Sequence, residues 1–165
     1  MISIWLCPTH EDELYLQKII NKLSENYNSP IFLPHCTLLG GIKLNEFDLE
    51  NIIDISIDNI GLIKIKSNGI DYTNIIWKTV FIKLVLDKKL KTLQEKFYKK
   101  IEPNIDYKFD PHISLMYKIL PDNTKKEIIN SFDLKSSFKM NKIAIVNTGQ
   151  NVSEWEIILE KKINA

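Results

Sequence analysis

Hydrophobic residues alternate in some stretches of the chain and recur at helical spacing in others, which predicts a protein of mixed α and β structure. Period two indicates strands, and repeats every three or four positions indicate helices. In the first half the expected elements are a strand at 2–6, a helix at 9–27, a strand at 35–40, a helix at 45–54 and a strand–turn–strand unit at 61–72. Asn68–Gly69 predicts the turn of that last unit.

The second half of the chain shows the same order of elements. The expected elements there are a strand at 77–86, a helix at 87–102, a strand at 112–117, a helix from 121 to about 132, and strands at 142–147 and 155–160. Strands that alternate with helices and hairpin-like runs favour an α+β fold with mainly antiparallel sheets.

The two halves also match residue by residue at an offset of 77 positions, which pairs His35 with His112 and Thr37 with Ser114. Flanking residues align in the pairs Phe32–Phe109, Pro34–Pro111, Leu38–Leu115, Gln17–Gln94 and Glu50–Glu127. A repeat of this length indicates a duplication. We therefore expect one bilobal domain over 1–165, with pseudo-repeats at about 2–72 and 77–160. Its two mainly antiparallel β-sheets would face a central groove, with the helices packed outside.

Two short motifs use two of the three histidines in the chain. They read LPHCT at 33–37 and DPHIS at 110–114. Residues two apart in a strand point to the same face, so each motif His shares a face with the Thr or Ser that follows it. The residues on the other face suit a core, so the polar faces should open onto the groove between the lobes. His10 has no counterpart at the matching position, and we assign it no function.

Two histidines that face each other across a groove suit general acid–base catalysis near neutral pH. On a cyclic phosphodiester, one His would take a proton from water and the other would protonate the leaving ribose oxygen. The hydroxyls of Thr37 and Ser114 would donate to phosphoryl oxygens. The predicted catalytic residues are therefore His35, Thr37, His112 and Ser114, with no metal and no cofactor. Because the halves match, the sequence leaves open which His is the base.

Other interpretations of the histidines are less favoured. A zinc site would need a third ligand at a recognisable spacing, which the sequence lacks. Cys36 is expected to point away from His35, so a nucleophilic Cys–His pair is not favoured either. A single His-x-Thr motif on a strand is usually a packing or surface feature. The matched pair of motifs at equivalent points of a duplicated chain is what favours catalysis.

Composition narrows the class of partner. The 22 basic and 21 acidic residues give a net charge of +1, which argues against binding to long nucleic acids. Every basic residue is a Lys, so no guanidinium can clamp a phosphate. Only two cysteines, no signal-peptide pattern and no apolar run long enough for a membrane span predict a cytoplasmic protein. We expect a monomer that takes a small nucleotide.

The paired motifs resemble those of the 2H phosphoesterase superfamily, and nearly the whole chain is most similar to its plant and yeast cyclic phosphodiesterases. The segments SIWLCP, FLPHCTLLG, DPHISLMY and KIAIVNTG carry this resemblance. It implies metal-independent hydrolysis of ADP-ribose 1″,2″-cyclic phosphate, of nucleoside 2′,3′-cyclic phosphates, or of both, to the phosphomonoester. It also implies that Tyr117, Trp5 and Trp77 bind the substrate.

The residues themselves say less about these aromatic positions. Trp77, Thr79 and Phe81 are expected on one face of a strand, where Trp77 could stack on a base and Phe81 belongs to the core. Two other activities stay open, namely cleavage of 2′–5′ oligoadenylates or cyclic dinucleotides by the same motifs, and binding of nucleotide ends without catalysis. The chain also departs from the family at residues 147–149, where an acidic residue is expected after the Thr.

Overall fold

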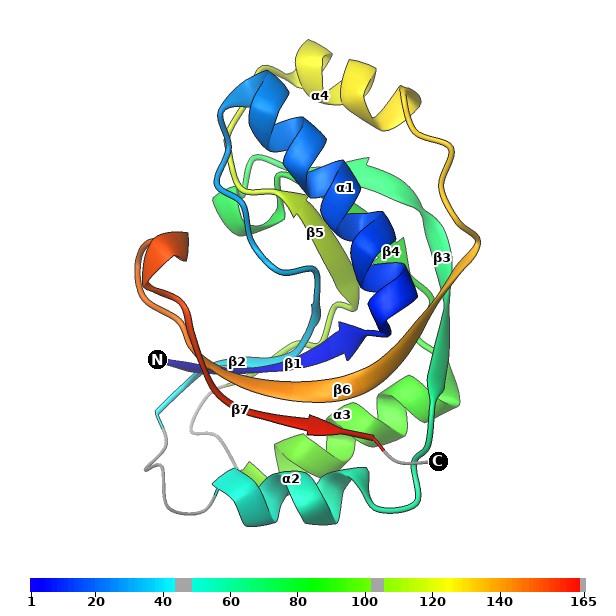
Figure 1. The fold of residues 1–165 in the computed structure, drawn as a ribbon, viewed down its shortest axis with the longest axis vertical. Coiled ribbons are helices and arrows are strands. Elements are labelled where there is room, and N and C mark those ends of the chain that lie inside the picture. Colours follow the sequence, from blue (N-terminus) through cyan, green and yellow to red (C-terminus); the bar gives the residue numbers. More distant parts are fainter. Residues whose placement is uncertain (44–48, 102–105, 164–165) are drawn as a thin grey trace.

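Seven β-strands and four α-helices make up the described part of the chain, which comprises residues 1–43, 49–101 and 106–163 of a computed structural model (Figure 1). The strands are β1 (Ile2–Pro8), β2 (Cys36–Ile42), β3 (Ile63–Tyr72), β4 (Val80–Leu84), β5 (His112–Met116), β6 (Ser137–Asn147) and β7 (Glu156–Lys162). The helices are α1 (His10–Tyr27), α2 (Leu49–Ile57), α3 (Lys88–Ile101) and α4 (Asp122–Asn130), with short 3₁₀ helices η2 (Ile76–Lys78) and η3 (Val152–Glu154). All pairs formed by these strands are antiparallel, which confirms the predicted α+β fold. The part of the predicted helix 45–54 that precedes Leu49 lies outside the described residues.

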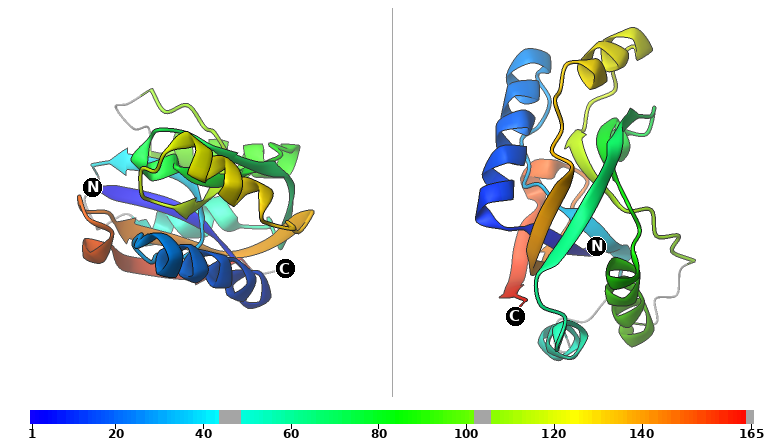
Figure 2. Two further views of the ribbon diagram at one scale, coloured as in Figure 1. Left: turned by 90° about the horizontal axis from the view of Figure 1, so that it is seen from above. Right: turned by 90° about the vertical axis from the view of Figure 1, so that its right-hand side faces the viewer.

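The strand order is β2–β1–β6–β3–β4–β5, and β7 pairs with β6. The strands of the two halves correspond in the pairs β1 and β4, β2 and β5, and β3 and β6. If each strand is replaced by its counterpart, the same order is obtained when it is read from the opposite end. As a result, β6 from the second half lies against β1, and β3 from the first half lies against β4. The two long strands also pair with each other through residues 63–66 and 137–140, and so they join the two sheets (Figure 2).

The predicted turn at Asn68–Gly69 is wrong, because residues 63–72 form one continuous strand. The first part of β3 pairs with β6 and the second part with β4, so each part has a partner other than its neighbour in sequence. The register with β4 shifts between Ser67 and Ile70, and Gly69 there has a positive φ of 83°. The Asn-Gly pair therefore serves a β-bulge, where Gly takes the backbone conformation that other residues avoid.

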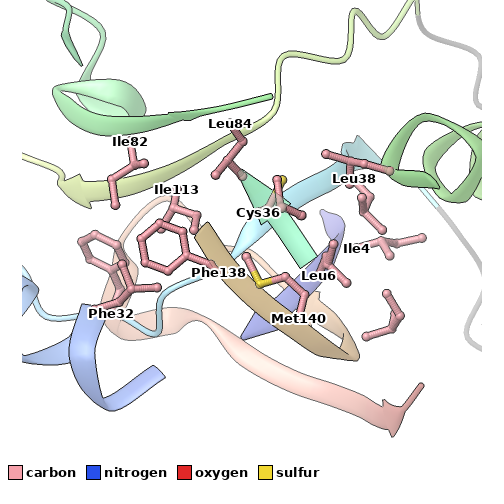
Figure 3. Close-up of a cluster of buried hydrophobic side chains, with 14 of the residues drawn as sticks. Ile4, Leu6, Phe32, Cys36, Leu38, Ile82, Leu84, Ile113, Phe138 and Met140 are labelled. Atoms are coloured by element: carbon pink, nitrogen blue, oxygen red, sulfur yellow. The ribbon is translucent and has the colours of Figure 1, made fainter. Parts of the chain in front are cut away.

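One continuous hydrophobic core serves both sheets. Ile4, Leu6 and Leu38 from the first half and Ile82 and Ile113 from the second belong to a single buried cluster (Figure 3). Full burial of an aliphatic side chain of this size contributes about 1.5–3 kcal/mol. The helices lie around the outside of the strands (Figure 2), where α1 packs against β1 and β5, and α3 against β2 and β3. Each of these elements therefore adds to the core that the two halves share.

Candidate active site

The two histidine motifs approach each other at the start of β2 and of β5. His35 lies one residue before β2 and His112 is the first residue of β5, so only the second lies within a strand as predicted. Cys36 and Ile113, the residues that follow the histidines, are fully buried in the core. The two histidines, Thr37 and Ser114 line one cavity of about 810 Å³. The alternation of faces along the strands therefore places all four predicted catalytic residues together.

The two histidines make the same hydrogen bond. Nδ1 of His35 lies 2.6 Å from the carbonyl oxygen of Leu33, and Nδ1 of His112 lies 2.7 Å from that of Asp110. A carbonyl can only accept, so Nδ1 carries the proton in both rings and Nε2 is the nitrogen available to a substrate. A proline separates donor and acceptor in each motif and restricts its own backbone and that of the residue before it. The prolines therefore favour the short loops that orient both rings.

The strands paired with the motifs repeat this correspondence. Trp5 is the cross-strand partner of Thr37, and Phe81 is the partner of Ser114. In both strand pairs the register shifts directly before this residue, between Ile4 and Trp5 in β1 and between Val80 and Phe81 in β4. Trp5 and Phe81 are 76 residues apart, so the constant offset of 77 does not hold for β1 and β4. The strand registers make Trp5 and Phe81 equivalent, whereas a sequence comparison without gaps pairs Trp5 with Ile82.

The ring next to each histidine differs in kind and in contact. Trp5 stacks on His35 with ring centroids 3.6 Å apart and an angle of 6° between the planes. Phe81 meets His112 edge-on at 5.5 Å and 74°. Phe81 is buried, as predicted, but it also forms part of the surroundings of the second histidine. The stacked indole shields one whole face of the His35 ring from water.

Burial lowers the pKa of both histidines because it disfavours the charged ring. His35 is only 6% exposed, and its pKa falls to about 4, with the nearby His112 adding a smaller lowering and the bond to Leu33 opposing it. The pKa of the half-buried His112 is also lowered by burial, with a further contribution from Lys78, while the bond to the Asp110 carbonyl opposes the change. Both rings are therefore neutral at pH 7.

Trp77 is not part of a strand, which corrects the prediction for residues 77–86. It lies in η2, ahead of β4, and is 43% exposed. Thr79, predicted on the same strand face, is fully buried and donates to the carbonyls of Ile75 and Ile76. The hydroxyl of Ser114 donates to the carbonyl of Trp77 at 3.0 Å. The second motif therefore fixes the loop that brings Trp77 to the cavity.

Tyr117 follows β5 and is buried at the cavity wall. Its ring stacks on Phe32 at 3.9 Å and meets Trp77 edge-on at 5.5 Å. Burial raises the pKa of its phenol, although a hydrogen bond with Ser114 partly offsets the effect. The structure thus places all three predicted aromatic residues, Tyr117, Trp5 and Trp77, at the cavity.

Trp155 also lines the cavity and was missed by the sequence analysis, which placed it in a strand at 155–160. It lies between η3 and β7, and its ring is 5.5 Å from Trp5, 5.8 Å from Trp77 and 5.6 Å from Tyr117. Its indole N–H donates to the carbonyl of Gly149 at 3.4 Å. The chain has three tryptophans, so the residue type of Trp155 could have drawn attention to it. It was not predicted at the site because it belongs to neither histidine motif.

The matching family model is described as cyclic phosphodiesterase-like protein and covers residues 1–163. The chain belongs to this family. The predicted membership of the 2H phosphoesterase superfamily is thereby confirmed, and with it the prediction of an enzyme of the cyclic phosphodiesterase type.

Three known proteins that are similar to this member of the cyclic phosphodiesterase-like family match nearly its whole length. A cyclic phosphodiesterase of Arabidopsis thaliana is 21% identical over 171 residues, which cover 98% of this chain and 94% of that protein. Escherichia coli LigT, in a complex with 3′-AMP, has a similar fold with a TM-score of 0.65 and 8% identity over 99% of this chain and 98% of its own. TT0787 of Thermus thermophilus gives a TM-score of 0.63 and 13% identity over 98% of this chain and 97% of its own. At these identities the structural likeness is one of fold.

Neither cysteine contributes a nucleophile to the cavity of this family member. Cys7 and Cys36 are buried free thiols, and burial raises the pKa of each to about 12. In the three described ranges, no group of three His, Cys, Asp or Glu side chains is arranged to hold a metal ion. Across those same residues, no helix has the length and apolar character needed to cross a membrane.

Proposed function

We propose that the protein hydrolyses cyclic ribose phosphates to phosphomonoesters, with ADP-ribose 1″,2″-cyclic phosphate and nucleoside 2′,3′-cyclic phosphates as substrates. For the nucleosides the product would be the 2′-phosphate. Family membership supports the reaction class, and the Arabidopsis relative bears the name cyclic phosphodiesterase. A cavity of about 810 Å³ lies within the usual range for small-molecule sites, roughly 300–1,000 Å³, and has room for a nucleotide.

The observation that carries this proposal is the identical arrangement of the two histidines. Each ring has its Nδ1 proton bound to the carbonyl two residues before it, and each lines the same cavity. A neutral ring held in this way accepts a proton at Nε2, and a charged ring donates one from Nε2. One pair of equivalent rings can therefore act as base and acid on opposite sides of a reacting phosphorus.

The proposed reaction is a displacement at phosphorus by water. Nε2 of the neutral histidine takes a proton from the water as its oxygen forms a bond to phosphorus. The bond between phosphorus and one ribose oxygen breaks, and the charged histidine transfers its Nε2 proton to that oxygen. The first histidine is then charged and the second neutral, so a proton must pass between them through solvent before the next turnover.

The hydroxyls and the aromatic residues have separate proposed roles. Thr37 and Ser114 would donate to the phosphoryl oxygens, whose negative charge grows as water adds. Ser114 donates to the Trp77 carbonyl, so its hydroxyl would have to turn toward a bound phosphate. The exposed ring of Trp77 would stack on the base or pack against the second ribose, and stacking on a base is worth about 1–3 kcal/mol. The buried rings of Trp5 and Tyr117 would line the wall of the substrate site. A small nucleotide bound by a monomer is the partner we propose.

Product analysis tests the proposal. The protein is incubated in EDTA with 2′,3′-cyclic AMP, with ADP-ribose 1″,2″-cyclic phosphate and with a 2′–5′ linked triadenylate, and the products are resolved by chromatography. We expect adenosine 2′-monophosphate from the first substrate or the corresponding monophosphate from the second. Cleavage of the triadenylate alone would replace the proposal with the alternative activity on oligonucleotide signals. No reaction with any of the three would indicate a binding module.

A further inference from the structure

We propose that Lys78 binds the substrate phosphate, leaving an ion pair with Asp110 to do so, and that it sets the preference of the site for anionic ligands. This inference rests on the proposed function and deepens it. Lys78 ends η2 and lines the cavity that holds both histidines. Neither motif includes it, and no sequence pattern predicted a role for it.

Lys78 is the only Lys side chain among the described residues that line the cavity. The chain contains 22 Lys and Arg residues, and every one is a Lys, so an ammonium is the only permanently charged side-chain group that could meet a phosphate. Both histidine rings are neutral at pH 7, because burial lowers their pKa values. The positive side-chain charge that is present before a substrate arrives therefore comes from Lys78.

The ammonium of Lys78 lies close to the second histidine. Its Nζ is 4.2 Å from the centre of the Phe81 ring, and the same ring meets His112 edge-on. Its charge also contributes to the lowered pKa of His112. Only 18% of the Lys78 side chain is exposed, so the charge is partly shielded from bulk water, which strengthens its interaction with a nearby anion.

Asp110 holds Lys78 in an ion pair. Its carboxylate pairs with the Lys78 ammonium, and its backbone carbonyl accepts from Nδ1 of His112. The Asp110 side chain is 62% exposed, so water can solvate it if Lys78 leaves. The backbone bond does not depend on the carboxylate, and His112 would keep its orientation during the exchange.

Only the second motif offers a carboxylate for such an ion pair. Leu33 stands in the first motif where Asp110 stands in the second, and its carbonyl orients His35 without offering a carboxylate. A phosphodiester carries one negative charge, and the addition of water with loss of its proton to the base creates a second. A cation placed on one side of the cavity would stabilise both the bound substrate and, more strongly, this transition state.

Lys78→Met and the matched control Lys161→Met test the proposal by phosphate binding. Lys161 pairs with Asp54 and Glu50, its side chain is 25% exposed, and it does not line the cavity, so its loss changes net charge and burial by a similar amount. Inorganic phosphate is titrated while tryptophan fluorescence and the histidine NMR signals are followed. We expect Lys78→Met to weaken phosphate binding roughly 10- to 100-fold, since hydrogen bonds to charged groups contribute about 1.5–3 kcal/mol. Lys161→Met should bind as the unaltered protein does.

Two further variants separate a bound cation from a structural residue. Lys78→Arg keeps the charge and should restore most of the phosphate affinity. Asp110→Asn removes the competing carboxylate and should tighten phosphate binding. Unchanged binding in Lys78→Met, or weaker binding in Asp110→Asn, would overturn the proposal that Lys78 moves from Asp110 to phosphate.

Turnover of 2′,3′-cyclic AMP distinguishes failure of this inference from failure of the proposed function. If the unaltered protein hydrolyses the substrate and Lys78→Met retains its kcat/KM, the inference fails and the function stands. If the unaltered protein hydrolyses none of the tested substrates but phosphate binding still depends on Lys78, the function fails and the phosphate site stands.

Discussion

The two histidine motifs are alike in their backbone and unlike in their surroundings. Both rings donate from Nδ1 to the carbonyl two residues earlier, and both sit beside a hydroxyl residue. Around His35 the neighbours are uncharged aromatic rings, whereas His112 lies near the ion pair of Lys78 and Asp110. The backbone thus gives the two rings one geometry, and the side chains around them give each a different affinity for a proton.

Acid–base catalysis by two equivalent groups requires such a difference in their affinity for a proton. A base must be neutral and an acid must be charged at the same pH, and two identical rings would share one pKa. Deep burial makes His35 the ring that most readily stays neutral, and the half-buried His112 is the ring that can more readily take a proton. We therefore expect His35 to act as the base and His112 as the acid.

Removal of either ring should have the largest effect. His35→Ala and His112→Ala should each lower kcat by about 10³-fold or more, with little change in KM, since proton transfer contributes about 10²–10⁴-fold in each role. The third histidine supplies the control, because exposed His10 at the start of α1 does not line the cavity. His10→Ala should leave kcat unchanged. If His35→Ala or His112→Ala kept a tenth of the activity, that histidine would not be essential.

The burial of His35 should make folding stability depend on pH. Its folded-state pKa of about 4 lies below the ordinary 6.5, so the unfolded chain binds more protons between these values. The contribution of His35 to the free energy of unfolding is fully present above pH 6.5. As pH falls from 6.5 toward 4, the free energy of unfolding decreases by up to about 3 kcal/mol. Urea unfolding of the unaltered protein and of His35→Gln over this range measures the slope. His35→Gln should flatten it more than His112→Gln does, and equal slopes in all three proteins would contradict the assignment.

The two hydroxyl residues should differ in a smaller way. Thr37→Val and Ser114→Ala should each lower kcat roughly 10- to 100-fold, because each removes a donor to the growing phosphoryl charge. Only Ser114→Ala also releases the Trp77 carbonyl, so only this variant should raise KM. Steady-state kinetics on one cyclic phosphate compares them, and an identical effect on KM would mean that the bond to Trp77 does not position the substrate.

The smallest effect concerns the shape of the pH profile. For the unaltered protein, kcat/KM should trace a bell whose maximum lies below pH 6.5, since the pKa of each ring is lowered. The residual activity of His35→Gln should lose the acidic limb, and that of His112→Gln should lose the alkaline limb. The opposite pattern would exchange the roles of base and acid.

The meeting of the two pairs of His and hydroxyl residues at one cavity was predictable from the sequence because it depends on local rules. Alternation along a strand placed His35 and Thr37 toward one face and Cys36 toward the other, and the repeat of the motif indicated a shared site. The α+β class followed equally from the order of apolar patterns. These features need no knowledge of which strands are neighbours.

Features that depend on long-range pairing were missed or misplaced. Asn68–Gly69 became a bulge because both parts of β3 found partners distant in sequence. Trp77 and Lys78 reach the cavity on a 3₁₀ turn held by hydrogen bonds from Thr79, Thr73 and Ser114, which no local pattern showed. Trp155 joins the site from the far end of the chain.

β3 and β6 each pair with a strand of the other half, and this exchange has a consequence for how such a chain could have arisen. A protein made of one half alone would lack the inner strand of its own sheet and would present its third strand to a second copy. Two copies could satisfy each other only as an intertwined homodimer, with two identical histidine motifs facing across the symmetry axis. Expression of the second half alone, followed by measurement of its oligomeric state, would test this. Gene fusion would then have allowed the surroundings of one motif to acquire Lys78 and Asp110, and so to diverge from those of its twin.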